Sequence, residues 1–203
     1  MTQADPSLRL FVAIELPETW KQGLGEVQQR MQQALAADAE TAAVRLRWVR
    51  PEGVHVTLKF IGEVAAARLP VIESQLALAV TAMPAISLRL GRAGAFSDRR
   101  SPRVIWAGVY SEQADTLRRL AEGVEIWLGA AGVPRERRGF TAHLTLARLP
   151  NDLPDELRLR VAELTVGVEQ PQLPPFAVER VSLMRSQLGP GGARYERIAA
   201  FPA

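Results

Sequence analysis

The first third of the chain alternates between continuous apolar runs and helical spacing. Residues 8–16 form a nearly continuous apolar run that Pro17 ends, as expected of a buried strand. A polar stretch follows in which apolar residues recur every three or four positions and predict an amphipathic helix: Trp20, Leu24, Val27, Met31 and Leu35. Two strands are predicted next, over residues 44–49 and 54–61, with a turn at 51–53. A second helix is predicted by Leu69, Ile72, Leu76 and Val80.

The same order of elements recurs in the next third of the chain. Residues 104–110 predict a buried strand, and apolar spacing over residues 117–127 predicts a third amphipathic helix. A Gly-Val-Pro stretch at residues 132–134 ends that helix. Another strand is predicted from about residue 140 to residue 149. Strand–helix–strand therefore appears twice.

The last third predicts a short helix over residues 155–164 and a hairpin formed by residues 176–188 and 194–201. None of the connecting stretches is long and polar enough to separate independent domains. Residues 1–203 are therefore interpreted as one bilobal domain.

The two closing strands of the repeat have nearly the same sequence. Residues 55–58 read HVTL and residues 143–146 read HLTL, and these motifs hold the only two histidines of the chain. Because side chains alternate between the faces of a strand, each motif buries an aliphatic row and presents an imidazole and a hydroxyl on the opposite face. A single histidine in a strand is usually structural, but two matching copies indicate a site made of His55, Thr57, His143 and Thr145.

Duplicated lobes commonly meet about a pseudo-two-fold axis, which would bring the two polar faces together. We therefore expect an α+β fold of two pseudo-two-fold-related lobes, each a mainly antiparallel sheet with helices on its outer side. The active site is expected in the cleft between the lobes. Of two imidazoles that titrate near neutrality, one can take a proton from water while the other gives one to a departing oxygen. Threonine hydroxyls can bind phosphate oxygens, so this equipment favours phosphoryl transfer without a metal or cofactor.

Composition narrows the class of protein. The chain is 47% hydrophobic and 23% charged, as is ordinary for a globular protein, and no apolar run approaches the roughly 20 residues that span a bilayer. The first residues do not resemble a secretory signal, and the lack of cysteine excludes a thiolate nucleophile and a Cys-ligated metal. We expect a cytoplasmic protein. No Walker-type loop or dinucleotide fingerprint indicates ATP or NAD.

The basic residues are almost all arginine, with 23 Arg and 2 Lys and a formal net charge of +3. That charge is too small for strong nonspecific binding of nucleic acid, but it allows local basic patches. Three arginine clusters occur, within residues 45–50, 99–103 and 135–138. Such clusters are usually solvated loops, so by themselves they do not establish function.

The chain resembles the two-histidine (2H) phosphoesterases, and within them the bacterial RNA 2′,3′-cyclic phosphodiesterases known as LigT or ThpR. Besides both H-x-T-x motifs, the resemblance includes RLFVAI at residues 9–14, WVRPEG at 48–53 and KFIGE at 59–63. It continues through RVIW at 103–106 and FTAH at 140–143. The resemblance covers nearly the whole chain, and its motifs together are highly specific.

The resemblance implies a role for each site residue. His55 would be the proton donor to the leaving ribose oxygen, and His143 the general base that activates water. Thr57 and Thr145 would hold the phosphate, and Arg148 would contact it as well. Strict alternation from His143 places Arg148 on the opposite face, so this last role requires the strand to bend or end.

The implied reaction opens an RNA 2′,3′-cyclic phosphate to a 2′-phosphomonoester, and its reversal joins RNA ends through a 2′–5′ linkage. The implied partners are RNA with cyclic phosphate ends, tRNA halves among them, or 2′,3′-cyclic nucleotides. No metal, other cofactor or membrane is expected, and the protein is expected to be a monomer.

Three other interpretations remain open. The two histidines could be metal ligands, although the motif strands contain no Cys, Asp or Glu to complete such a site. The fold could serve a non-catalytic RNA-binding protein, or the same chemistry could act on another cyclic or 2′–5′-linked nucleotide. An aromatic residue near the motifs could stack on a base, but core packing is the commoner fate of the four candidates: Phe11, Trp48, Phe60 and Phe140.

Overall fold

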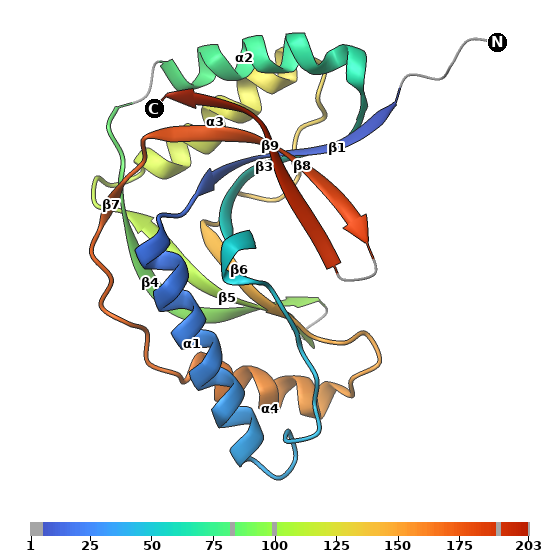
Figure 1. Ribbon diagram of the computed structural model, residues 1–203, viewed down its shortest axis with the longest axis vertical. Coiled ribbons are helices and arrows are strands. Elements are labelled where there is room, and N and C mark those ends of the chain that lie inside the picture. Colours follow the sequence, from blue (N-terminus) through green and yellow to red (C-terminus); the bar gives the residue numbers. More distant parts are fainter. Residues whose placement is uncertain (1–5, 82–83, 99–100, 190–191, 203) are drawn as a thin grey trace, which may run out of the picture.

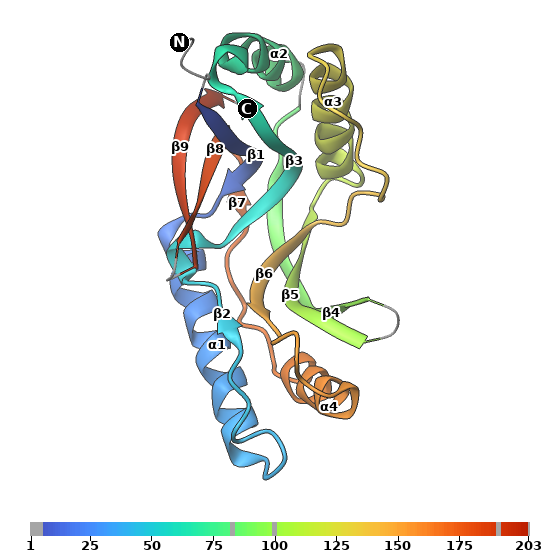
Figure 2. The same ribbon diagram turned by 90° about the vertical axis from the view of Figure 1, so that its right-hand side faces the viewer.

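The structure, a computed structural model, describes residues 6–81, 84–98, 101–189 and 192–202. In this part of the chain nine strands form one antiparallel sheet, with helices packed on one side of it (Figures 1 and 2). The path through the sheet is β7-β4-β5-β6-β3-β1-β8-β9, and β2 pairs with β6 beside this path. The predicted α+β class is confirmed.

The strands differ widely in length. Those that form the centre and the longer edges of the sheet are β1 (Ser7–Glu15), β3 (His55–Ala65), β4 (Ser87–Asp98), β5 (Ser101–Ser111), β6 (His143–Arg148), β8 (Arg180–Gly189) and β9 (Gly192–Pro202). Two strands have only two residues each, β2 (Arg47–Trp48) and β7 (Phe176–Ala177).

Four α-helices pack in two pairs on the outer side of the sheet. One pair is α1 (Glu18–Ala37) with α4 (Asp155–Val166), and the other is α2 (Leu69–Thr81) with α3 (Thr116–Ala130). Figure 2 shows the two pairs at opposite ends of the molecule, with the open face of the sheet between them. Apolar spacing predicts α1, α2 and α3, because each needs one apolar stripe to bury, and the sequence also predicts α4 as a short helix over residues 155–164.

The two predicted lobes appear as two halves of this one sheet. One half is β3-β1-β8-β9 and the other is β6-β5-β4-β7, so β3 corresponds to β6 and β1 to β5. The halves join where β3 pairs with β6, through the single residue pair Val56 and Leu144. Each of these residues directly follows the histidine of its motif, so the pseudo-two-fold axis lies beside the motifs.

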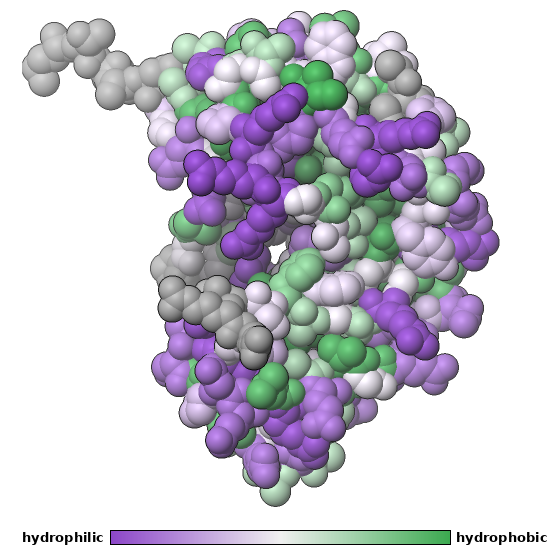
Figure 3. All heavy atoms as spheres, turned by 180° about the vertical axis from the view of Figure 1, so that it is seen from behind, coloured by the Kyte–Doolittle hydropathy of each residue, from purple (hydrophilic) through white to green (hydrophobic). Residues whose placement is uncertain are grey.

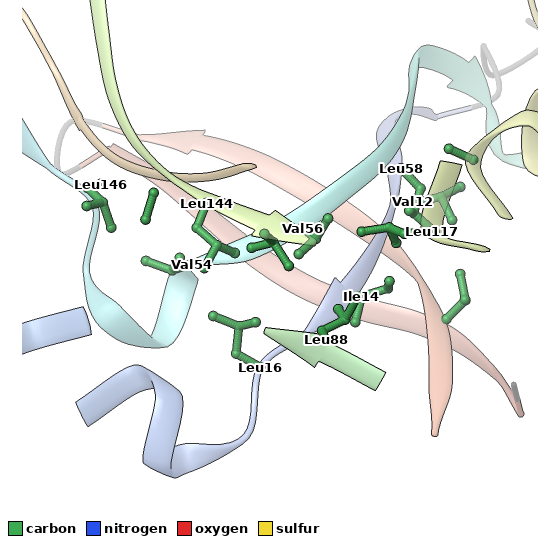
Figure 4. Packing of buried hydrophobic residues seen from close by; sticks show 14 of the residues in the cluster. Val12, Ile14, Leu16, Val54, Val56, Leu58, Leu88, Leu117, Leu144 and Leu146 are labelled. Atoms are coloured by element: carbon green, nitrogen blue, oxygen red, sulfur yellow. The ribbon is translucent and has the colours of Figure 1, made fainter. Parts of the chain in front are cut away.

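The aliphatic residues of the motifs lie in the centre of the core. Val56, Leu144 and Leu146 have no exposed surface, and Leu58 is 6% exposed. Figure 4 shows these side chains together with Val54 and residues of β1 on the helix side of the sheet. Burial of each such side chain stabilises the fold by about 1.5–3 kcal/mol. This burial fixes the register, and therefore directs the histidines and threonines to the other face.

Both motif strands contain a β-bulge at the same place. The pairing of β1 with β3 shifts between Val12 and Ala13, which leaves Leu58 as an extra residue on β3. The pairing of β5 with β6 shifts in the same way between Ile105 and Trp106, which leaves Leu146 as the extra residue on β6. After each bulge the side chains return to the face of the motif one position later than strict alternation predicts.

Three parts of the sheet differ from the sequence prediction. The hairpin strand predicted over residues 176–188 is divided into β7, which pairs with β4, and β8, which pairs with β9. The sequence does not predict β4, because its central residues 91–95 read GRAGA and lack the β-branched and aromatic residues typical of strands. The strand predicted over residues 44–49 is only the two-residue β2, which pairs with the end of β6.

Candidate active site

The register of the two motif strands brings the four predicted residues together. Because Val56 lies opposite Leu144 in an antiparallel pair, the same register sets His55 against Thr145 and Thr57 against His143. All four side chains are half-buried and line one cavity. Each histidine therefore has the threonine of the other motif as its cross-strand neighbour.

The cavity has a volume of about 1530 Å³ and lies on the open face of the sheet. Its walls come from strands β1 and β3 to β6, from α3, from the loop that precedes β6 and from the β8–β9 hairpin. The space-filling view in Figure 3 shows hydrophilic side chains near a hollow in the middle of the molecule. The cavity thus joins both halves of the repeat in one site.

Each imidazole is held by an equivalent hydrogen bond to the backbone carbonyl two residues before it. Nδ1 of His55 lies 2.8 Å from the carbonyl oxygen of Gly53, and Nδ1 of His143 lies 2.8 Å from that of Thr141. A carbonyl oxygen can only accept, so Nδ1 is the protonated nitrogen of each neutral ring. Nε2 of either ring has no hydrogen-bond partner among the described residues, and it can accept a proton when neutral or donate one when charged.

Aromatic rings fix the planes of both imidazoles. Phe11 stacks on His55 with 4.8 Å between ring centroids, and Tyr195 meets the same ring edge-on at 5.0 Å. Phe96 meets His143 edge-on at 4.7 Å. A histidine held by one hydrogen bond and an aromatic contact has little freedom to rotate, so Nε2 keeps a defined position for proton transfer.

The pKa of each histidine lies below the usual value. Burial lowers the pKa of His55 most; the Gly53 carbonyl partly offsets this, and the nearby His143 lowers it further. Burial also lowers the pKa of His143, with the Thr141 carbonyl opposing and the charge of Arg148 adding to the effect. The charge interaction between the two rings shows that they share one electrostatic environment.

We expect this burial to make the fold sensitive to mild acid. Between the lowered pKa and the unfolded value of about 6.5, the unfolded chain binds more protons, so stability falls as pH decreases through this window. Urea unfolding at pH 7.5 and pH 5 should show a smaller loss of unfolding free energy for His55→Gln than for the wild type. The same loss in both proteins would contradict the burial cost.

The two motif threonines have no hydrogen-bond partner for their hydroxyls within the part of the chain that the structure describes. Two buried threonines differ: the hydroxyl of Thr41 donates to the Leu35 carbonyl at 2.9 Å, and that of Thr165 to the Val161 carbonyl at 2.7 Å. The hydroxyls of Thr57 and Thr145 are thus free to bind a ligand in the cavity.

The bulge in β6 places Arg148 on the motif face. Leu146 and Ala147 are buried one after the other with no exposed surface, and Arg148 then lies exposed and lines the cavity. Strict alternation from His143 predicts the opposite face, because the spacing alone gives no sign of the extra residue. A phosphate contact by Arg148 requires the strand to bend before this residue, and the bulge at Leu146 provides that bend.

The structure also contains neighbours of the histidines that the sequence analysis did not single out. Glu15 is the cross-strand partner of His55, and its carboxylate accepts from Ser182 at 2.5 Å and from Arg197 at 2.9 Å. One feature of the sequence could have pointed to Glu15 as a site residue: it is a charged residue near the end of the apolar run 8–16. No feature of the sequence points to Tyr195, because only the pairing of the distant β8–β9 hairpin brings it to His55.

The aromatic residues and arginine clusters named from the sequence differ in whether they lie in the core or line the cavity. Phe11 is buried, Trp48 and Phe140 pack against the core, and Phe60 alone of the four candidates is largely exposed, at 58%, in the cavity. Among the arginine clusters, residues 103, 135 and 138 line the cavity. Residues 99 and 100 lie outside the described residues.

The described part of the chain contains neither a group of metal ligands nor a membrane-spanning helix. No three His, Asp or Glu side chains are grouped there so as to hold a metal ion. No helix described by the structure is both long enough and apolar enough to cross a membrane.

Two facing imidazole–hydroxyl pairs on a duplicated sheet define the site of a phosphoesterase of the two-histidine class. The family model described as LigT like Phosphoesterase matches residues 14–106 and 108–195, and each segment contains one H-x-T-x motif. The chain belongs to this family. The family predicted from the sequence is thereby confirmed.

Curated relatives carry the name that the sequence analysis reached. A protein named RNA 2′,3′-cyclic phosphodiesterase from Methanothermobacter thermautotrophicus is 30% identical over 96% of this chain and 98% of its own length. One of the same name from Archaeoglobus fulgidus is 31% identical over 96% of this chain and 99% of its own.

Solved structures agree with the fold. The crystal structure of TT0787 from Thermus thermophilus matches with a TM-score of 0.74 and 27% identity, covering 96% of this chain and 97% of that one. Escherichia coli LigT complexed with 3′-AMP matches with a TM-score of 0.67 and 25% identity, covering 97% and 98%.

Proposed function

We propose that the protein is an RNA 2′,3′-cyclic phosphodiesterase that hydrolyses a terminal cyclic phosphate to a 2′-phosphomonoester without a metal ion. The observation that carries this proposal is the meeting of His55, Thr57, His143 and Thr145 in one cavity, with both Nε2 atoms and both hydroxyls unengaged by any described residue. The names of the curated relatives support the same reaction.

The proposed reaction is a displacement at phosphorus with two proton transfers. Nε2 of His143 takes a proton from water as the water oxygen bonds to phosphorus. The bond from phosphorus to the 3′ oxygen breaks, and Nε2 of charged His55 gives its proton to that oxygen. The hydroxyls of Thr57 and Thr145, with the guanidinium of Arg148, bind the non-bridging oxygens as their negative charge grows.

Two differences between the pseudo-equivalent halves support this division of roles. The cross-strand partner of His55 is Glu15, whereas the corresponding partner of His143 is Gly108. Glu15 acts to raise the pKa of His55, against the larger effect of burial, and so favours the charged donor.

The second difference lies five residues after each histidine, beyond the bulge. Arg148 occupies this place after His143 and lowers the pKa of that ring, which favours the neutral base. Phe60 occupies the same place after His55 and carries no charge. The two halves therefore have the same backbone arrangement but different charges near the histidines. An acidic residue beside His55 favours the charged donor, and a basic residue near His143 favours the neutral base.

The proposal extends to the biological setting. The substrates are RNA ends with a cyclic phosphate, tRNA halves among them, and the reversal of the reaction forms a 2′–5′ linkage. All proposed site residues come from one chain, which is consistent with a monomer. An RNA substrate favours the cytoplasm as the place of action.

The test is to incubate protein freed of metal by a chelator with an RNA that ends in a 2′,3′-cyclic phosphate. We expect full activity and a 2′-phosphate product, because side chains supply both the protons and the stabilising charge. Product isomers can be separated by chromatography. Loss of activity that one divalent metal restores would favour the metal-site interpretation, and binding of RNA without turnover would favour a binding protein.

A further inference from the structure

The cavity is larger than a site for one nucleotide requires. Its volume of about 1530 Å³ exceeds the roughly 300–1,000 Å³ typical of small-molecule sites. It continues from His55 along β3 as far as Gly62, which is about 20 Å of strand. The four motif residues and Arg148 line only part of this cavity, so its stretch along β3 beyond Thr57 can make further contacts with a ligand.

Lys59 lies along this extension but is not free to bind substrate. The residue is 3% exposed, and its ammonium donates to the two carboxylate oxygens of Glu125 at 2.6 and 2.8 Å and to the Pro134 carbonyl at 2.7 Å. These three bonds use all its protons. Lys59 therefore ties β3 to α3 and to the start of the loop that precedes β6.

The same ion pair holds the next residues of that loop. Glu125 also accepts the backbone N–H of Glu136 at 3.1 Å, and the Glu136 carboxylate accepts the backbone N–H of Arg137 at 3.1 Å. Glu136 is thus turned toward its own backbone. The loop is fixed at its beginning by Lys59 and continues at its end into the strand of His143.

This loop presents unpaired cations to the cavity. Arg135 and Arg138 are exposed and line it, as does Arg9 on β1, and none of the three guanidinium groups has a hydrogen-bond or ion-pair partner among the residues described. Elsewhere arginines are commonly paired, as Arg118 is with Asp115 and Glu122, and Arg160 with Asp38 and Glu163. Free cations gathered along a cavity favour a polyanion as its ligand.

We propose that Arg9, Arg135 and Arg138 bind the phosphodiester backbone of the RNA nucleotides that precede the cyclic end, with Lys59 and Glu125 as positioning residues for the loop. This inference rests on the proposed function and specifies its substrate as an RNA strand rather than a free cyclic nucleotide. Guanidinium groups suit phosphate because their planar fork can bind two oxygens.

The test compares two substrates, an oligoribonucleotide with a 2′,3′-cyclic end and 2′,3′-cyclic AMP. For the double variant Arg135→Gln/Arg138→Gln we expect kcat/KM on the oligonucleotide to fall on the order of tenfold or more, through KM, because each hydrogen bond to a charged group contributes about tenfold or more. The value on cyclic AMP should not change. The slope of log kcat/KM against log salt should lessen by about 1.4 for two lost contacts to a single strand.

Arg137→Gln is the matched control, since Arg137 is exposed in the same loop but does not line the cavity. It should behave as the wild type on both substrates. Equal losses on both substrates for the double variant, or an Arg137→Gln variant as impaired on the oligonucleotide, would overturn the inference. A wild type that cleaves neither substrate would instead refute the proposed function.

The positioning role is tested with Glu125→Ala, which leaves Lys59 and the loop without their shared partner. We expect KM for the oligonucleotide to rise several-fold while kcat/KM for cyclic AMP stays unchanged, with folding checked by circular dichroism. If the ion pair only stabilised the fold, the two substrates would be affected alike, and that outcome would refute the positioning role.

Discussion

His55→Ala should lose on the order of 10²–10⁴-fold in kcat/KM on an RNA cyclic phosphate, the usual contribution of a positioned acid, yet much less on an activated aryl phosphodiester. An aryl oxide is already a stable leaving group, so it needs no donated proton. His143→Ala should be impaired by a similar factor on both substrates, because water still needs its base. Steady-state kinetics of both variants on both substrates checks this expectation.

The outcome also decides the direction of the roles. Rescue by the aryl substrate in His143→Ala instead of His55→Ala would reverse the donor and the acceptor, and the charges of Glu15 and Arg148 would then need another explanation. Equal losses on both substrates in both variants would show that neither histidine protonates the leaving group. The wild-type kcat/KM should follow a bell-shaped pH profile whose two limbs belong to the coupled pair.

Thr57→Ala and Thr145→Ala should each lower kcat by about 10²–10³-fold, the typical cost of losing one hydrogen-bond donor to the transition state. Stability should change little, because neither hydroxyl has an intramolecular partner to lose among the described residues. Thr165→Ala is the matched control: its buried hydroxyl donates to the Val161 carbonyl at 2.7 Å, so this change should lower stability and leave kcat unchanged.

Urea unfolding and kcat are to be measured on the same preparations of these threonine variants. If Thr57→Ala or Thr145→Ala lowers stability but leaves the activity per folded molecule normal, the motif threonines are structural. That outcome would contradict their proposed role in binding the phosphate.

The sequence by itself determined most of the helices and strands and the motif residues of the candidate site. Apolar spacing predicts α1, α2 and α3 because each must bury one stripe. Period-two alternation in the H-x-T-x strands separates Val56 and Leu144 from the polar residues beside them. The duplication of the motif further predicts that both copies meet. These features depend on local periodicity, which a sequence records directly.

Only the tertiary structure decided where the two halves join and which charges surround each histidine. The side of Arg148 depends on a bulge at Leu146, and a bulge arises from pairing with a neighbouring strand rather than from the spacing of one strand. Glu15, Tyr195 and the Lys59–Glu125 pair reach the cavity through contacts between segments far apart in the chain. Such contacts follow from strand order and register, which are set by packing of the whole core and leave no periodic signal in the sequence.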